Sequence, residues 1–211
     1  MDGFNMDYTI IIPTCKPRKF LNKQLNEILF YSTDKPKIVT TCAEASAAVN
    51  RNIGLNMAKS EFVIMCDDDI HGFFQGWDRL LILPMLEDEN IVMVSACLVN
   101  IEGGFALMMN IKHDLTKKIQ VIDNRFLPSS CIAFRKDTLK FDEEYIGSGW
   151  EDSDFCRQMQ DKYPCGKFVI NNSVRLIHDN NMTNQTLWGD NSKYYAKKWG
   201  LECDSNGRII I

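Results

Sequence analysis

Residues 61–69, with the sequence Glu-Phe-Val-Ile-Met-Cys-Asp-Asp-Asp, constrain the fold more than any other stretch. An uninterrupted apolar run is typical of a strand that is buried on both faces of a sheet, and this run leads directly into three carboxylates. At the carboxyl end of a parallel strand, these acids would lie where open α/β sheets bind their ligands. A divalent cation with oxygen ligands would relieve their mutual repulsion. The stretch therefore predicts a metal site, with a solvated acidic turn as the alternative.

The sequence on either side alternates between strand and helix patterns. Runs rich in β-branched and apolar residues predict strands at 8–12, 37–42, 61–66, 91–99, 130–134 and 173–177. Apolar residues that recur at helical spacing predict helices at 16–31, 45–58, 73–87 and 151–162. Such alternation favours parallel strands joined by right-handed crossovers. We expect one α/β domain over residues 1–211, with a Rossmann-like, mixed but mostly parallel central sheet flanked by helices, and a hairpin or insertion within 100–126.

Composition excludes several classes of protein. The net charge is −4 and no basic run is present, so general nucleic-acid binding is not expected. Residues 1–7 lack the features of a secretory signal, and no apolar run approaches the ~20 residues of a transmembrane helix. The eight cysteines form no CxxC pair, which favours reduced thiols over disulfides or a zinc site. A cytoplasmic protein is expected.

Several polar residues follow strands that should run in the same direction. Pro13 and Thr14 follow the first strand, Glu44 the second and the three aspartates the third, which predicts that they line one edge of the sheet. Arg51, near the start of the second helix, is a candidate for binding a phosphate or a base carbonyl, and an exposed arginine on a solvated helix face is the alternative. Because no glycine-rich phosphate loop is present, metal and side chains would have to hold the phosphates.

A second informative region spans residues 141–155. Glycines flank Trp150, and a large aromatic residue on such a loop is a suitable platform for a sugar ring. Acidic residues then open a predicted helix. Ser148 and Glu151 match a capping box, which gives Glu151 a structural alternative to a functional role.

The ordered set of motifs resembles the nucleotide-sugar glycosyltransferases of the GT-A fold, in particular the large inverting family 2. The motifs are Tyr8-Thr-Ile-Ile-Ile-Pro-Thr, Arg51-Asn-Ile-Gly-Leu-Asn-Met-Ala-Lys-Ser-Glu-Phe-Val, Cys66-Asp-Asp-Asp, Phe141-Asp-Glu-Glu-Tyr, Gly149-Trp-Glu-Asp-Ser-Asp-Phe and Ile177-His-Asp-Asn. The segment Gly149-Trp-Glu-Asp is also similar to the β-1,4-galactosyltransferases. The resemblance covers about residues 7–180 and implies a hexosyltransferase-like enzyme of class EC 2.4.

On the donor side, the resemblance implies a site for a nucleoside-diphosphate sugar, preferably a UDP-sugar. The nucleotide-binding residues would be Pro13, Thr14, Glu44, Arg51, Asp67 and Asp68. Mn²⁺ or Mg²⁺ would be held by the D-x-D pair Asp67 and Asp69 together with His178, although a lone histidine after an apolar strand is otherwise more often a core or surface residue. The loop Cys42-Ala-Glu-Ala-Ser departs from the Asp-Asp-Gly-Ser pattern of the family, so Glu44 is a loose match to the acid that reads the base.

On the acceptor side, the resemblance implies that Asp152 is the catalytic base and that Glu151 binds the acceptor together with Trp150. Single displacement by a glycan, lipid-linked or other hydroxyl acceptor would then invert the anomeric carbon. Residues 1–100 would form the nucleotide-binding half, and residues 101–211 the acceptor-binding half with a C-terminal tail. The alternatives are an inactive module that binds a sugar nucleotide or glycan, and a nucleotidyltransferase, which usually has a glycine-rich loop after the first strand.

Overall fold

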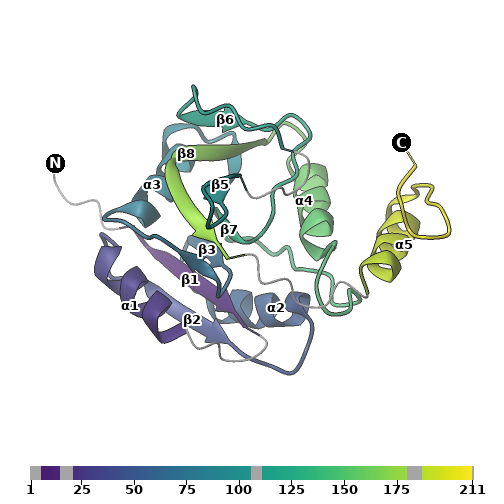
Figure 1. Cartoon of the computed structure of the whole chain (residues 1–211), viewed down its shortest axis with the longest axis horizontal. Coiled ribbons are helices and arrows are strands. Elements are labelled where there is room, and N and C mark those ends of the chain that lie inside the picture. Colours follow the sequence, from purple (N-terminus) through teal and green to yellow (C-terminus); the bar gives the residue numbers. More distant parts are fainter. Residues whose placement is uncertain (1–5, 15–20, 106–110, 180–186, 211) are drawn as a thin grey trace.

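The computed structural model describes residues 6–14, 21–105, 111–179 and 187–210, and its strands form one mixed sheet (Figure 1). The order is β2-β1-β3-β7-β5-β8-β4, and β6 pairs with β8 beside this path. The strands are β1 (Tyr8–Pro13), β2 (Lys37–Thr41), β3 (Phe62–Cys66), β4 (Ile70–His71), β5 (Ile91–Val99), β6 (Ile119–Val121), β7 (Cys131–Arg135) and β8 (Lys167–His178). The helices are α1 (Leu21–Tyr31), α2 (Ala47–Met57), α3 (Trp77–Glu87), α4 (Glu151–Lys162) and α5 (Trp188–Trp199).

Most strands of the sheet run in the same direction. β2 and β3 are parallel to β1, and β8 is parallel to β5. β7 is antiparallel to both β3 and β5, so β1, β2, β3, β5 and β8 share one direction while β4, β6 and β7 run against it. The expected single domain with a mixed, mostly parallel sheet is therefore confirmed. The carboxyl ends of β1, β2, β3 and β8 all lie at one edge.

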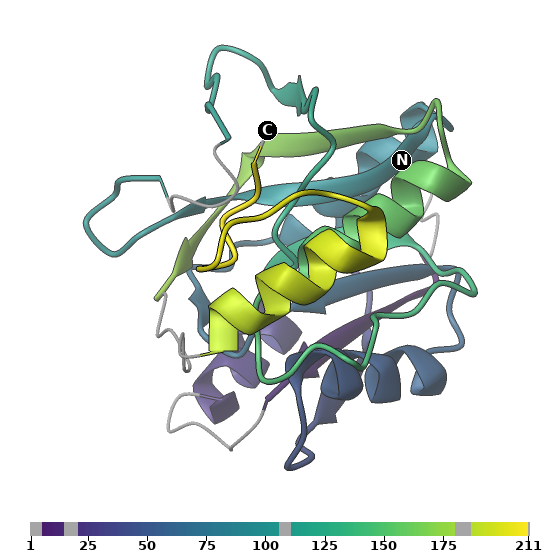
Figure 2. The same cartoon turned by 90° about the vertical axis from the view of Figure 1, so that its right-hand side faces the viewer.

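Two apolar cores cover the two faces of this sheet. Because successive side chains of a strand point to opposite faces, Ile10 of β1 lies in one core and Ile11 in the other. The first core joins the sheet to α1 and α3 and contains Trp77. The second joins it to α2 and α4 and contains Phe155. Figure 2 shows α5 lying outside these layers, beside α4.

The sequence misses two short strands and the full length of a third. β4 and β6 have only two and three residues, too few to show a periodic pattern. β8 begins at Lys167 rather than at residue 173, because the polar Asn171 lies buried in the strand and donates to the carbonyl of Leu80. α3 begins four residues later than expected, after Gly76 with a left-handed φ of 79°. Residues 16–20 of the first expected helix lie outside the described residues.

The seven described cysteines are free thiols, and four of them are buried at positions 66, 97, 131 and 156. Within the described residues, no helix is long and apolar enough to cross a membrane.

The contact between α2 and β1 leaves no room for a side chain at position 54. A Cβ atom added to Gly54 would lie 2.2 Å from the Cγ2 atom of Ile11, deep in the second core. We expect Gly54→Ala to lower the free energy of unfolding by about 1–3 kcal/mol or more, because overpacking forces α2 away from the strand. Urea denaturation measures this loss. The control is Gly104→Ala, whose nearest neighbours are side-chain atoms of Asn100 on an exposed turn. Equal stability of the two variants would contradict the close α2–β1 contact.

Candidate functional site

The backbone around the three aspartates is fixed at the end of β3. The N–H of Asp67 donates to the carbonyl of Ser130 (2.7 Å), and the buried side chain of Gln24 donates to the carbonyl of Asp67 (2.8 Å). The chain then turns into β4, where Ile70 lies opposite His178 at the end of β8. Two strand ends that are distant in sequence are thus brought together.

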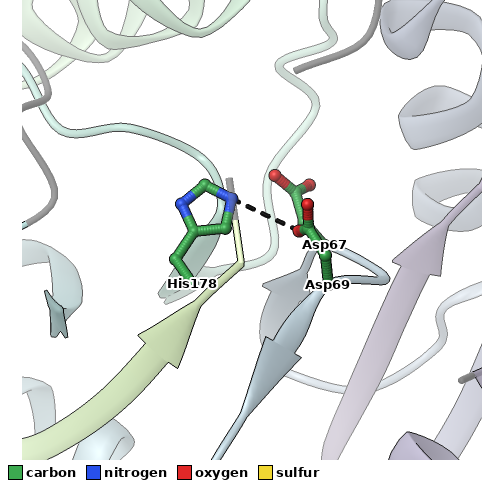
Figure 3. A group of neighbouring side chains, drawn as sticks. All are labelled: Asp67, Asp69 and His178. Carbon is green, nitrogen blue, oxygen red and sulfur yellow. Dashed lines mark ion pairs between the residues drawn. The ribbon is translucent and has the colours of Figure 1, made fainter. Parts of the chain in front are cut away.

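Asp67, Asp69 and His178 form a cluster of possible metal ligands (Figure 3). One ligand atom from each lies within 4.8 Å of the others, and the Nε2 atom of His178 is 3.2 Å from Oδ1 of Asp69. Asp69 and His178 are buried, and Asp67 is partly buried. Two carboxylates and one imidazole are donors that suit Mn²⁺, and the carboxylates also suit Mg²⁺, so the residues fit a divalent cation.

The neighbouring carboxylates also change the pKa of the His178 imidazole. Burial alone would lower the pKa of this imidazole, but the hydrogen bond to Asp69 and the charges of Asp67 and Asp179 outweigh it and raise the pKa. Within the described part of the chain, the Nδ1 atom of His178 has no hydrogen-bond partner. A cation bound here would take the place of the proton, since a histidine ligand must be neutral.

Arg51 bridges the two sides of the site. Its side chain is buried, with Nη1 at 2.5 Å from Oε1 of Glu151 and Nη2 at 3.3 Å from Oδ1 of Asp67. Burial opposes its charge, but the carboxylates of Glu151, Asp67 and Asp152 outweigh this effect and raise the pKa of Arg51. The alternative of an exposed arginine on a solvated face is therefore wrong. The guanidinium instead connects the metal cluster to the start of α4.

The loop before α4 presents Glu151 through an unusual backbone. Trp150 is the N-cap residue and has a left-handed φ of 74°, while Gly149 has a φ of 108°. The N–H of Gly149 donates to Oε2 of Glu151, so this carboxylate is bound at both oxygens. The capping box expected from Ser148 and Glu151 is wrong, because the N-cap residue of α4 is Trp150 rather than Ser148, and the helix begins at Glu151.

Asp152, the next residue, is a partly buried acid with a shifted pKa. Burial raises the pKa of its carboxyl to about 7, and the Glu151 and Asp67 carboxylates add to the rise. The Arg51 guanidinium and the N–H of Ser153, which donates to Oδ1 at 2.8 Å, oppose it. A carboxyl group in this range can accept a proton near neutral pH.

The other predicted donor-side residues lie at the same edge of the sheet. Pro13 ends β1, and the buried Thr14 follows it with its N–H bonded to the carbonyl of Thr41 (2.7 Å). Asp68 is buried between the two aspartates of the metal cluster, whereas Glu44 is exposed in the loop between β2 and α2. Their roles in nucleotide binding stay predictions.

The C-terminal helix α5 packs against the residues predicted to bind the acceptor, a contact that the sequence did not show. The buried carboxylate of Asp154 accepts from Nζ of Lys198 (2.9 Å) and from Nε1 of Trp199 (2.8 Å), both on α5. At the other end of α5, the side chain of Asn191 bonds the backbone of Ile146 and Gly149. These residues lie in a helix with mixed polar and aromatic residues, where no motif distinguishes them from surface positions.

Comparisons with known proteins identify the fold. The sequence matches no protein-family model and no curated protein. Among solved structures, residues 1–349 of S. aureus TarS match with a TM-score of 0.59 and 15% identity over 82% of this chain and 60% of that chain. GalNAc-T7 with UDP, GalNAc and Mn²⁺ matches with a TM-score of 0.57 and 12% identity over 97% of this chain and 49% of that chain. TarS 1–349 in complex with UDP gives a TM-score of 0.60 and 14% identity over 82% of this chain and 60% of that chain.

These similarities confirm the GT-A fold expected from the sequence. The chain spans between 39% and 60% of the length of the TarS and GalNAc-T7 structures that it matches.

The two ion pairs of Arg51 lead to a prediction about the free energy of unfolding. Arg51→Met leaves Glu151 and Asp67 as buried charges without their cation, so we expect it to lower the free energy of unfolding by about 3–5 kcal/mol. Combined with Glu151→Gln, the loss should be smaller than the sum of the two single losses by about 1–3 kcal/mol. Urea denaturation of the four proteins completes the double-mutant cycle.

The matched control is Lys37→Met, which removes an exposed ion pair to Asp7 at 3.1 Å and should cost less than about 1 kcal/mol. Additive losses at Arg51 and Glu151, or a loss no larger than that of the control, would show that the guanidinium does not hold the acids together.

The raised pKa of Asp152 leads to a prediction about how the free energy of unfolding depends on pH. Its pKa of about 7 in the folded protein exceeds the ~3.9 of an unfolded aspartate, so the folded state retains the proton between these values and loses stability as the pH rises through them. Asparagine does not titrate in this range, so the Asp152→Asn variant does not lose stability in this way. Relative to the wild type, the variant should therefore gain on the order of 4 kcal/mol in unfolding free energy between pH 4 and pH 8. If the difference in unfolding free energy between the variant and the wild type were the same at every pH in this range, the pKa of Asp152 would not be raised in the folded protein.

Proposed function

We propose that the protein is a metal-dependent inverting glycosyltransferase that moves a sugar from a nucleoside-diphosphate sugar, preferably a UDP-sugar, to an acceptor hydroxyl. The observation that carries the proposal is the convergence of Asp67, Asp69 and His178 within 4.8 Å at the ligand-binding edge of a GT-A sheet. The fold of this chain is similar to the crystal structures of TarS 1–349 with UDP and of GalNAc-T7 with UDP, GalNAc and Mn²⁺. This similarity supports the choice of donor and metal.

On the donor side, Asp67, Asp69 and His178 hold the cation, Mn²⁺ or Mg²⁺. When bound there, the cation supplies Lewis-acid stabilisation of the negative charge on the departing diphosphate. Pro13, the buried Thr14 and Asp68, and the exposed Glu44 follow strands whose carboxyl ends lie at this edge, and they bind the nucleotide.

Arg51 also belongs to the nucleotide-binding residues. In the structure its two terminal nitrogens bind Glu151 and Asp67, and its Nε atom has no hydrogen-bond partner among the described residues. Because a guanidinium has five N–H donors, Arg51 can bind the nucleotide while it sets the position of Asp67.

On the acceptor side, Asp152 takes the proton of the attacking hydroxyl. As the hydroxyl oxygen bonds to the anomeric carbon, the bond from that carbon to the diphosphate breaks and the proton passes to the Asp152 carboxylate. A single displacement of this kind inverts the anomeric carbon. Glu151 helps to bind the acceptor while its two oxygens remain fixed by Arg51 and the Gly149 N–H.

A thermal-shift panel tests the donor site. Nucleoside diphosphates and sugar nucleotides are measured with Mn²⁺, Mg²⁺ or EDTA on the wild type and on Asp69→Ala. At a hundredfold excess over Kd, we expect UDP with Mn²⁺ to raise the Tm by about 5–10 °C, since a ligand that binds only the folded state stabilises it. Asp69→Ala should lose the shift, whereas Asp123→Ala, at an exposed position, should keep it. If no nucleotide shifts the wild type, the donor site is wrong.

Turnover separates an enzyme from an inactive binding module. We expect Asp152→Asn to keep the shift with UDP and Mn²⁺ but to release nucleoside diphosphate from its donor about 10²–10⁴-fold more slowly than the wild type. Because the pKa of Asp152 is about 7, the wild-type kcat/KM should fall tenfold per pH unit below that value. Equal turnover by the variant would remove Asp152 from the reaction.

A further inference from the structure

Building on the proposed function, we infer that the acceptor is a carbohydrate and that its ring stacks on the indole of Trp188, at the start of α5. The sequence placed this platform at Trp150. We infer Trp188 instead, a residue that lies outside every motif on which the resemblance rests.

The ring contacts explain the change. The ring of Trp150 is packed against Trp188, with centroids 5.2 Å apart, and against Tyr195, with centroids 4.9 Å apart. Trp150 is partly buried and Tyr195 is buried, whereas Trp188 is 48% exposed. Trp150, which is itself packed on Tyr195, therefore supports the ring of Trp188, and Trp188 offers the apolar surface to a ligand.

The platform lies beside the acids that would bind and deprotonate an acceptor. A Cβ atom at Gly149 would lie 3.0 Å from Cδ1 of Trp188, so the indole packs directly over this glycine. The N–H of the same glycine donates to Glu151, and Asp152 follows in the chain. A ring stacked on Trp188 would thus lie beside the loop that leads into the proposed catalytic base.

The platform is also preformed. The buried side chain of Asn191 accepts from the N–H of Ile146 and donates to the carbonyls of Ile146 (2.9 Å) and Gly149 (3.0 Å). This clamp fixes the loop to the first turn of α5, which carries Trp188. A rigid aromatic surface binds at a low entropic cost, because little needs to be ordered when the ligand arrives.

The size and surroundings of the surface favour a sugar over a lipid chain. Among the described residues of this region, Ile146 is exposed and Leu187 is partly buried, while Asp190 and Lys193 on α5 are exposed and charged. A pyranose ring has one apolar C–H face, which matches an indole, and a rim of hydroxyls, which match charged and carboxylate groups. An acyl chain would require a longer apolar groove.

The test is saturation-transfer difference NMR, with UDP and Mn²⁺ present, on a panel of cellotetraose, chitotetraose, maltotetraose, mannotetraose and xylotetraose. We expect at least one of these to bind the wild type through its ring C–H protons. Trp188→Ala should weaken that binding at least tenfold, and Trp188→Phe should recover part of it. The control is Phe30→Ala, which removes an aromatic residue that is 74% exposed on α1 and should leave binding unchanged.

The outcomes distinguish this inference from the proposed function. If UDP and Mn²⁺ stabilise the wild type but no tetrasaccharide binds, or if Trp188→Ala binds as tightly as Phe30→Ala, the carbohydrate platform is wrong and the donor site stands. If UDP and Mn²⁺ do not stabilise the wild type, the proposed function itself fails. A normal shift of Trp188→Ala with UDP and Mn²⁺ shows that the variant is folded.

Discussion

The buried guanidinium of Arg51 is the interaction on which the site depends. It lies between Asp67, at the end of a central strand, and Glu151, at the start of α4, and each of these acids would be costly to bury without a cation. Since the two acids come from opposite halves of the chain, the ion pairs hold the end of β3 and the start of α4, the proposed donor and acceptor sides, in one arrangement. The same positive charge limits how far the pKa of Asp152 rises. Stability and the proposed chemistry therefore rest on one side chain.

Sheet topology supplies the rest of the geometry. β3 and β8 run in the same direction, so Asp67 and His178 lie at the same edge although 111 residues separate them in sequence. The two-residue β4 then draws Asp69 to His178, because Ile70 pairs with His178 across the antiparallel ladder. A cluster of possible metal ligands forms without a dedicated binding loop. The packing of α5 against α4 and the Trp150 loop completes the surroundings of the proposed acceptor residues.

The sequence predicts the sheet and the cluster of possible metal ligands better than the contacts around the start of α4. The apolar runs of β1, β3 and β5 and the acids after β3 are local signals, and the structure confirms the strands at those positions. The contact of Arg51 with Glu151 joins residues that are 100 positions apart, and no local pattern reports it. The sequence also did not single out Trp188, the carbohydrate platform inferred from the structure, because its exposure depends on how α5 packs. The capping box at Ser148 failed for a related reason, since the left-handed backbone at Trp150 starts the helix later.

The most direct measurement of the central claim is anomalous diffraction from crystals grown with UDP and Mn²⁺. A manganese peak bounded by the Asp67 and Asp69 carboxylates and the His178 imidazole, with UDP density reaching it from the edge of the sheet, is the predicted result. Manganese bound elsewhere, or UDP bound without contact to these residues, would contradict a metal-dependent donor site at the end of β3.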